Sequence, residues 1–149
     1  MKEKVGRDGD TVKLLRECDA GIKMGISSID DVVYDVKNEK LKSMLDECKR
    51  RHEVLSIEVG ALLDEHSDSG KNPNPMAKSM SFIKTNAKMM ASPCDETIAD
   101  LMTDGCNMGV KSLAKYLNQY KSADDKSREI ARNLITLENN LSNDLRKYL

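Results

Sequence analysis

The sequence predicts an all-α protein, a four-helix bundle made of two antiparallel hairpins. Apolar residues recur at spacings of three and four through four long segments, which is typical of amphipathic helices that pack together. All three prolines fall between positions 73 and 93, so the rest of the chain is free to be helical. A nine-residue pattern also occurs twice, at 21–29 and again at 105–113, with Gly, Met, Gly and Ser at matching positions. This internal repeat indicates two related hairpins.

The first helix is expected to begin at Asp10 or Thr11, because both residue types cap helix N-termini. Positions 1–9 are then a flexible N-terminus, and 10–149 form a single domain. The apolar seam of this helix consists of Leu15, Ile22, Ile26, Ile29, Val33 and Val36. Asp19 interrupts this seam, at a position where an apolar residue is expected.

The second helix is expected over about 39–66, after a short connection that makes it antiparallel to the first. Its seam follows a strict alternation of four and three residues: Leu41, Leu45, Cys48, His52, Leu55, Val59 and Leu62. His52 is the one strongly polar residue in this seam. Each of these two long helices should measure roughly 35–40 Å.

A crossover at 67–92 is expected to join the two hairpins. It begins with a turn-rich stretch and continues as a short amphipathic helix from Pro75 to Met90. Methionines and lysines share this predicted helix, so it is a candidate docking surface for a protein partner or for an acidic lipid surface.

The third helix is expected from a cap at Ser92 to about Tyr120, and the fourth follows a similar cap at 122–125. The inner face of the third helix is Ile98, Met102, Gly105, Gly109, Leu113, Tyr116 and Tyr120. The seam of the fourth is Ile130, Leu134, Leu137, Leu141, Leu145 and Tyr148. Periodicity, caps and the repeat therefore agree on the same architecture.

Composition excludes several classes of protein. The net charge is −1 with acids and bases interspersed, which argues against a nucleic-acid partner. No apolar run approaches the roughly 20 residues that an integral membrane helix needs. The chain opens with a charged stretch rather than a secretory leader. Its four cysteines lack the CxxC spacing, which favours reduced thiols and a cytoplasmic location.

Two internally repeated hairpins joined by a long crossover resemble the ferritin-like bundles, and most of all the small bacterial ferritin-like domains of unknown function. The stretches 17–21 and 104–109 carry this resemblance. Ferritin-like iron proteins place an acid on the first and third helices and Glu-x-x-His on the second and fourth. Here His52 follows Lys49 where a glutamate is needed, and Glu138 precedes Leu141 where a histidine is needed. The resemblance therefore implies the fold with a degenerate di-iron motif.

Two hypotheses concern the polar residues of the interior. In one, Asp19, His52, Asp104 and Glu138 form a non-standard metal or redox site that holds iron or manganese, because carboxylates and imidazole suit these metals. In the other, Asp19 and His52 form a buried polar pair or network that fixes the register of the helices. In a simple hairpin the two side chains are offset by about one turn, so they can meet only along a diagonal.

Cys94 is the candidate reactive thiol, because it is expected in the first turn of the third helix, where the positive end of the helix dipole favours a thiolate. The glycine pairs 21/25 and 105/109 each lie on one helical face. They predict close approach of the first and third helices, or else room for a bulky neighbour or a small ligand.

The sequence thus leads to a non-catalytic structural or protein-interaction module that works without a cofactor, most simply as a homodimer. Tyr116, Tyr120, Tyr148 and the Pro75–Met90 helix are its candidate contacts. A metal-binding or redox protein is the alternative, and a small apolar ligand carrier is a third hypothesis. No complete catalytic motif is present, so an enzyme is not expected.

Overall fold

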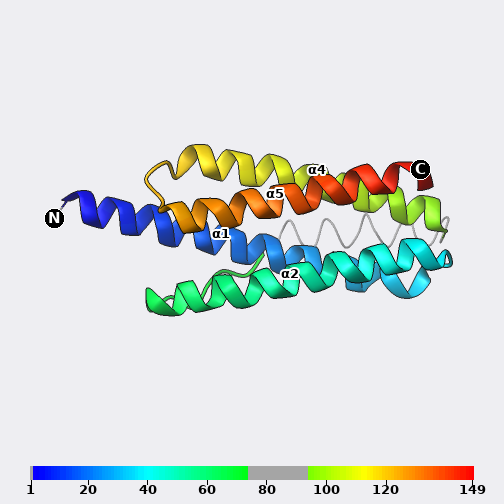
Figure 1. Cartoon of the computed structure of the whole chain (residues 1–149), viewed down its shortest axis with the longest axis horizontal. Coiled ribbons are helices and arrows are strands. Elements are labelled where there is room, and N and C mark those ends of the chain that lie inside the picture. Colours follow the sequence, from blue (N-terminus) through cyan, green and yellow to red (C-terminus); the bar gives the residue numbers. More distant parts are fainter. Residues whose placement is uncertain (1, 74–93) are drawn as a thin grey trace.

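The computed structural model describes residues 2–73 and 94–149, with side chains from Gly9 onward. Over these residues the chain is all-helical, without strands (Figure 1). The long helices are α1 (Lys2–Val32), α2 (Glu39–Glu65), α4 (Asp95–Gln119) and α5 (Asp125–Leu145). Short 3-10 turns follow α1, at Val33–Asp35, and α5, at Arg146–Tyr148. The four predicted long helices are confirmed.

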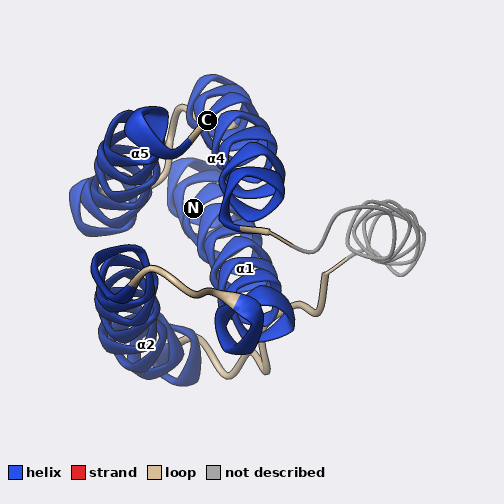
Figure 2. Ribbon diagram, turned by 90° about the vertical axis from the view of Figure 1, so that its right-hand side faces the viewer, coloured by secondary structure: helices blue, strands red, loops and turns tan. Residues whose placement is uncertain are grey.

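The helices form two antiparallel pairs, α1 with α2 and α4 with α5 (Figure 1). Viewed end-on, α1 lies beside α2 and α4, and α5 lies beside α4 and α2 (Figure 2). This arrangement is compatible with a four-helix bundle. α2 ends at one end of the molecule and α4 begins at the other, so these two helices run in the same direction (Figure 1). The crossover helix predicted for 75–90 lies outside the described residues.

The predicted start of the first helix is wrong, because α1 is already helical from Lys2. Asp10 and Thr11 cap another part of the chain instead. Asp10 Oδ2 accepts the backbone N–H of Ser122 at 3.0 Å, and Thr11 Oγ1 accepts that of Asp124 at 2.9 Å. A side chain that can cap its own helix can also satisfy a neighbouring helix start. These two bonds fix the α4–α5 connection against α1.

The helix starts are otherwise satisfied as their residue types suggest. Asn38 caps α2 by accepting from Leu41 N–H at 3.0 Å, and Asp124 caps α5 by accepting from Ser127 N–H at 2.8 Å. The predicted cap at position 92 lies outside the described residues, and the residue at the N-cap of α4 is Cys94, whose side chain makes no cap bond. Asp95 instead accepts two backbone N–H groups of the α1–α2 turn, which ties the first hairpin to α4.

The buried apolar residues form two separate clusters along the bundle, and each draws on all four long helices. The turn-end cluster, nearer the α1–α2 connection, contains Ile29, Val32, Val33, Leu41, Leu45, Cys48, Ile98, Ala99, Met102, Cys106, Leu141 and Leu145. The far cluster contains Leu14, Leu15, Cys18, Ile22, Val59, Leu63, Leu113, Ala123, Ile130, Ala131 and Leu134. Most members are the predicted seam residues. The candidate site lies between these two clusters.

Candidate functional site

One layer of the bundle lacks buried apolar residues and divides the two clusters. Between the clusters, one position in each helix holds a small or polar residue. These positions are Gly25 in α1, His52 in α2, Gly109 in α4 and Glu138 in α5. In α1 and α5 this position lies next to the seam residues Ile26 and Leu137. We call this set the central layer. Each helix contributes one residue to it, and the two glycines are the matching second glycines of the sequence repeat.

His52 and Glu138 meet in this layer and link the two hairpins. His52 Nε2 lies 3.0 Å from Glu138 Oε1, and the two side chains are only 2% and 14% exposed. His52 Nδ1 lies 2.8 Å from the backbone oxygen of Cys48, one turn earlier in α2. A carbonyl oxygen can only accept, so Nδ1 carries a hydrogen. Both ring nitrogens are therefore engaged.

The charge state of the pair follows from these contacts. Burial lowers the pKa of His52, but the hydrogen bonds to Cys48 and Glu138 raise it by more, to about 10. His52 is then an imidazolium that donates from both nitrogens, and Glu138 accepts as a carboxylate. Burial raises the pKa of the neighbouring Cys106 thiol, and the negative charge of Glu138 raises it further. The layer thus holds one ion pair beside a neutral thiol.

The glycines make room for this pair. A Cβ atom at Gly25 would lie 2.8 Å from His52 Nε2, closer than real contacts allow, whereas at Gly109 it would lie 3.5 Å from the Glu138 carboxyl group. At Gly21 and Gly105 such an atom would meet nothing within 4 Å. The first of the two interpretations of these glycines, close approach of two helix backbones, is therefore wrong. Gly25 instead leaves space for a bulky neighbour, which was the alternative.

Asp19 belongs to a different region. It is 6% exposed and accepts the Lys71 backbone N–H at 2.9 Å and the Lys23 ammonium at 2.7 Å. Lys71 also forms an ion pair with Glu17. This group, the Asp19 anchor, fastens the loop after α2 onto α1. The diagonal pairing of Asp19 with His52 is not formed, because the loop backbone supplies a donor nearer to Asp19.

The proposed metal-ligand set is accordingly divided. His52 and Glu138 are together, and Asp19 is in the anchor. Asp104 is a half-buried residue of α4. Within residues 2–73 and 94–149, no three His, Cys, Asp or Glu side chains are grouped so that they could hold a metal ion. Lys49, at the degenerate motif position, pairs with Asp30 at 2.6 Å, and its side chain is 31% exposed. The lysine therefore lies at the rim and not inside the layer.

Cys94 is partly exposed at the N-cap of α4, with its Sγ 3.3 Å from Thr97 Oγ1. The other three cysteines are buried. Burial also raises the pKa of Cys18, to about 12, and the nearby charges of Glu17 and Asp19 contribute. Among the four thiols, Cys94 is the one that a reagent in solution can reach.

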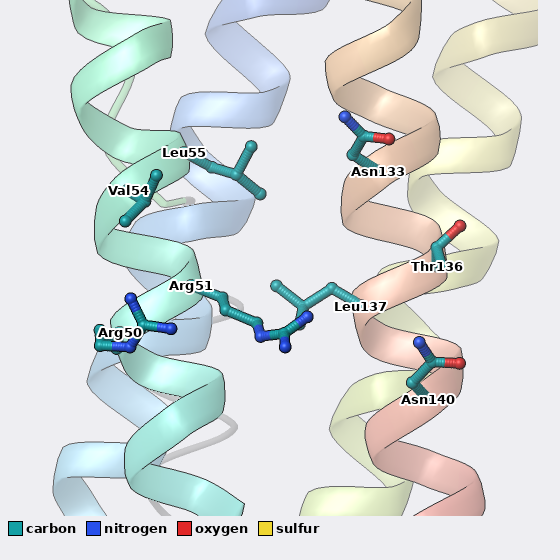
Figure 3. Close-up of a pocket in the computed structure, with 8 residues that line it drawn as sticks. All are labelled: Arg50, Arg51, Val54, Leu55, Asn133, Thr136, Leu137 and Asn140. Atoms are coloured by element: carbon teal, nitrogen blue, oxygen red, sulfur yellow. The ribbon is translucent and has the colours of Figure 1, made fainter.

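A shallow groove runs between α2 and α5 on the outside of the bundle. Arg50, Arg51, Val54, Leu55, Asn133, Thr136, Leu137 and Asn140 line it. In Figure 3, Leu55 and Arg51 reach from α2 toward Leu137 of α5 across the gap. The groove does not lie at the four repeat glycines, where the ligand-carrier hypothesis places a cavity.

The predicted contact tyrosines are partly engaged by the fold itself. The rings of Tyr116 and Tyr120 stack with centroids 6.2 Å apart and pack against the far cluster, and Tyr148 packs against the turn-end cluster. In the described chain no helix has the length and apolar character needed to cross a membrane.

Sequence reasoning identified His52 and Glu138 separately and missed that they are partners. The sequence signal for the pairing was partial, because His52 interrupts the seam of α2, whereas Glu138 stands beside the unbroken seam of α5 and is marked only as the glutamate of the degenerate Glu-x-x-His motif. Comparison of the chain with known protein families, curated proteins and solved structures finds no match.

Proposed function

We propose that this protein is a non-catalytic bundle of ferritin-like architecture that acts by binding another protein chain, with an ion pair where ferritin-like iron proteins hold their metals. The observation that carries the proposal is the His52–Glu138 contact. It joins the second and fourth long helices, which are the two that carry Glu-x-x-His in those iron proteins. Two helices running in the same direction on either side of the crossover also support the ferritin-like arrangement.

The engaged ring nitrogens of His52 favour this function over metal chemistry. A metal ligand must offer a lone pair, so a metal would have to displace a proton from His52 and break a buried ion pair. The contact instead holds the two hairpins in one register, as buried polar pairs do in some other bundles. An interior fixed in this way leaves the surface as the functional part of the molecule.

The test is the metal content of protein purified without chelator from cells supplemented with iron and manganese. We expect far less than one metal per chain in the wild type and in His52→Ala. Because His52→Ala could unfold, His52→Gln is measured in parallel, with circular dichroism to confirm that each variant is helical. Near-stoichiometric metal in the wild type that disappears in both variants would refute the proposal and establish the metal-binding alternative.

A further inference from the structure

The outward face of α2 carries apolar residues that the bundle does not cover. Ile57 is 76% exposed and Val54 is 54% exposed. Ala61 is also exposed, one turn further along. Spacings of three and four place the three side chains on one face of the helix. His52 and Val59, on the opposite face, are almost fully buried, so these three side chains, which we call the α2 stripe, point directly away from the core.

Opposite charges flank the α2 stripe at equal distances from its centre. Arg50 lies seven residues before Ile57, and Asp64 lies seven residues after it. Seven residues are two helical turns, about 10 Å along the axis, so both residues stay on the face of the stripe. Both are exposed. The face is thus apolar at its centre, with Arg50 toward one end and Asp64 toward the other. Glu53, four residues before Ile57, is also exposed on this face, and its carboxylate is ion-paired with Lys49 at 3.9 Å.

A surface with this pattern is complementary to itself. A two-fold axis through Ile57, perpendicular to α2, carries each residue to the position equally far on the other side of Ile57. It therefore places Arg50 of the first copy beside Asp64 of the second. At the opposite end of the interface, Asp64 of the first copy lies beside Arg50 of the second. Self-complementarity of this kind is what an isologous dimer interface requires.

We infer that the partner of this protein is a second copy of itself, bound by antiparallel packing of the α2 stripes about Ile57. This inference rests on the proposed function and names the partner. Gly60 favours the contact, because no atom lies within 4 Å of the place where its Cβ would be, which leaves the surface open beside Val54 of the second copy. Burial of exposed Val and Ile side chains supplies the driving force.

The charged ends select the orientation of the two helices. Arg50 already donates to Glu47 at 2.6 and 2.9 Å, and its guanidinium has five N–H donors in all, so it can hold Asp64 of the second copy as well. In a parallel dimer Arg50 would face Arg50, and Asp64 would face Asp64. Like charges placed opposite each other disfavour that arrangement.

The first experiment measures the mass of the full chain in solution by sedimentation over a concentration series. We expect the wild type to approach twice the 16.7 kDa of one chain. Ile57→Glu should weaken the dimer at least about tenfold, because it places two carboxylates at the two-fold axis. The matched control is Met108→Glu on α4, where Met108 is 67% exposed, and this variant should dimerise like the wild type.

A charge exchange tests the antiparallel register. Arg50→Asp and Asp64→Arg should each weaken the dimer, and the double variant should recover it, because both end contacts are restored with reversed sign. A monomeric wild type, an unaffected Ile57→Glu or a double variant no stronger than the single variants would overturn the inference. A metal-free monomer would refute the homodimer and leave the proposed function standing. Stoichiometric metal in a dimer would refute the proposed function alone.

Discussion

Two acids of the bundle, the half-buried Glu138 in the central layer and the buried Asp19 in the anchor, are neutralised by different kinds of partner. Each has a carboxylate that the apolar seam cannot satisfy. Glu138 is matched by a side chain of the other hairpin, 86 residues away in the sequence. Asp19 is matched mainly by the backbone of a loop and by Lys23 of its own helix.

The difference shows what each contact stabilises. The His52–Glu138 pair spans α2 and α5, so losing it affects the association of the two hairpins. The Asp19 bonds fasten the stretch around Lys71, so losing them affects one loop. A buried charge whose partner is removed costs more than a lost surface contact. The central layer should therefore dominate stability, and the following experiments test this ranking from the largest expected effect to the smallest.

The largest effect is expected from His52→Ala. This change leaves the carboxylate of Glu138, only 14% exposed, without its partner and opens a cavity, and it should lower the free energy of unfolding by about 3–5 kcal/mol. The double variant His52→Leu/Glu138→Leu should be clearly more stable than the single variant, because it replaces both partners with apolar side chains. Urea unfolding measures both. If both variants lost the same free energy of unfolding, the unpaired charge of Glu138 would not be the cause of the loss.

The second effect is a dependence of stability on pH. The pKa of His52 is higher in the folded protein than in the unfolded chain, so protonation of His52 stabilises the fold. This stabilisation is complete below the unfolded pKa of about 6.5 and is lost as the pH rises toward about 10. The free energy of unfolding should fall across this window, by at most about 1.4 kcal/mol per pH unit. His52→Gln should remove this part of the slope. If the free energy of unfolding depended on pH in the same way in His52→Gln, groups other than His52 would be responsible.

The third effect separates the two glycines of α1. Gly25→Ala forces a methyl group against His52 Nε2 and should destabilise the protein by about 1–3 kcal/mol. Gly21→Ala is the matched control in the same helix. Because open space surrounds that position, its higher helix propensity should leave the protein equally stable or more stable, by up to about 1 kcal/mol. Similar effects of the two changes would contradict the role given to Gly25.

The smallest effect is expected at the anchor. Asp19→Asn keeps an acceptor for Lys71 N–H but loses its charge, and it should cost about 1 kcal/mol. Hydrogen exchange of the Lys71 amide should become faster, while amides of α5 keep their protection. The ranking would be reversed if α5 lost protection as well, since the anchor would then support the whole bundle.

Much of the fold was predictable from the sequence, because helices and their buried faces depend on local spacing. The strict alternation of four and three in α2 correctly placed Leu41, Leu45 and Val59 in the core. The start of α1 was not predictable in the same way. Asp10 and Thr11 have the chemistry of caps, and nothing local reveals that their acceptors serve the α4–α5 connection.

The sequence by itself determined the four helices, their apolar seams, and the fact that Asp19 and His52 interrupt those seams. Only the tertiary structure decided the partners: His52 with Glu138, Asp19 with the loop at Lys71, and Gly25 as the space that His52 fills. The physical reason is that a spacing pattern specifies which face of a helix is buried. The meeting of two buried polar groups depends on the rotation and axial offset of separate helices, which the packing of the whole bundle sets.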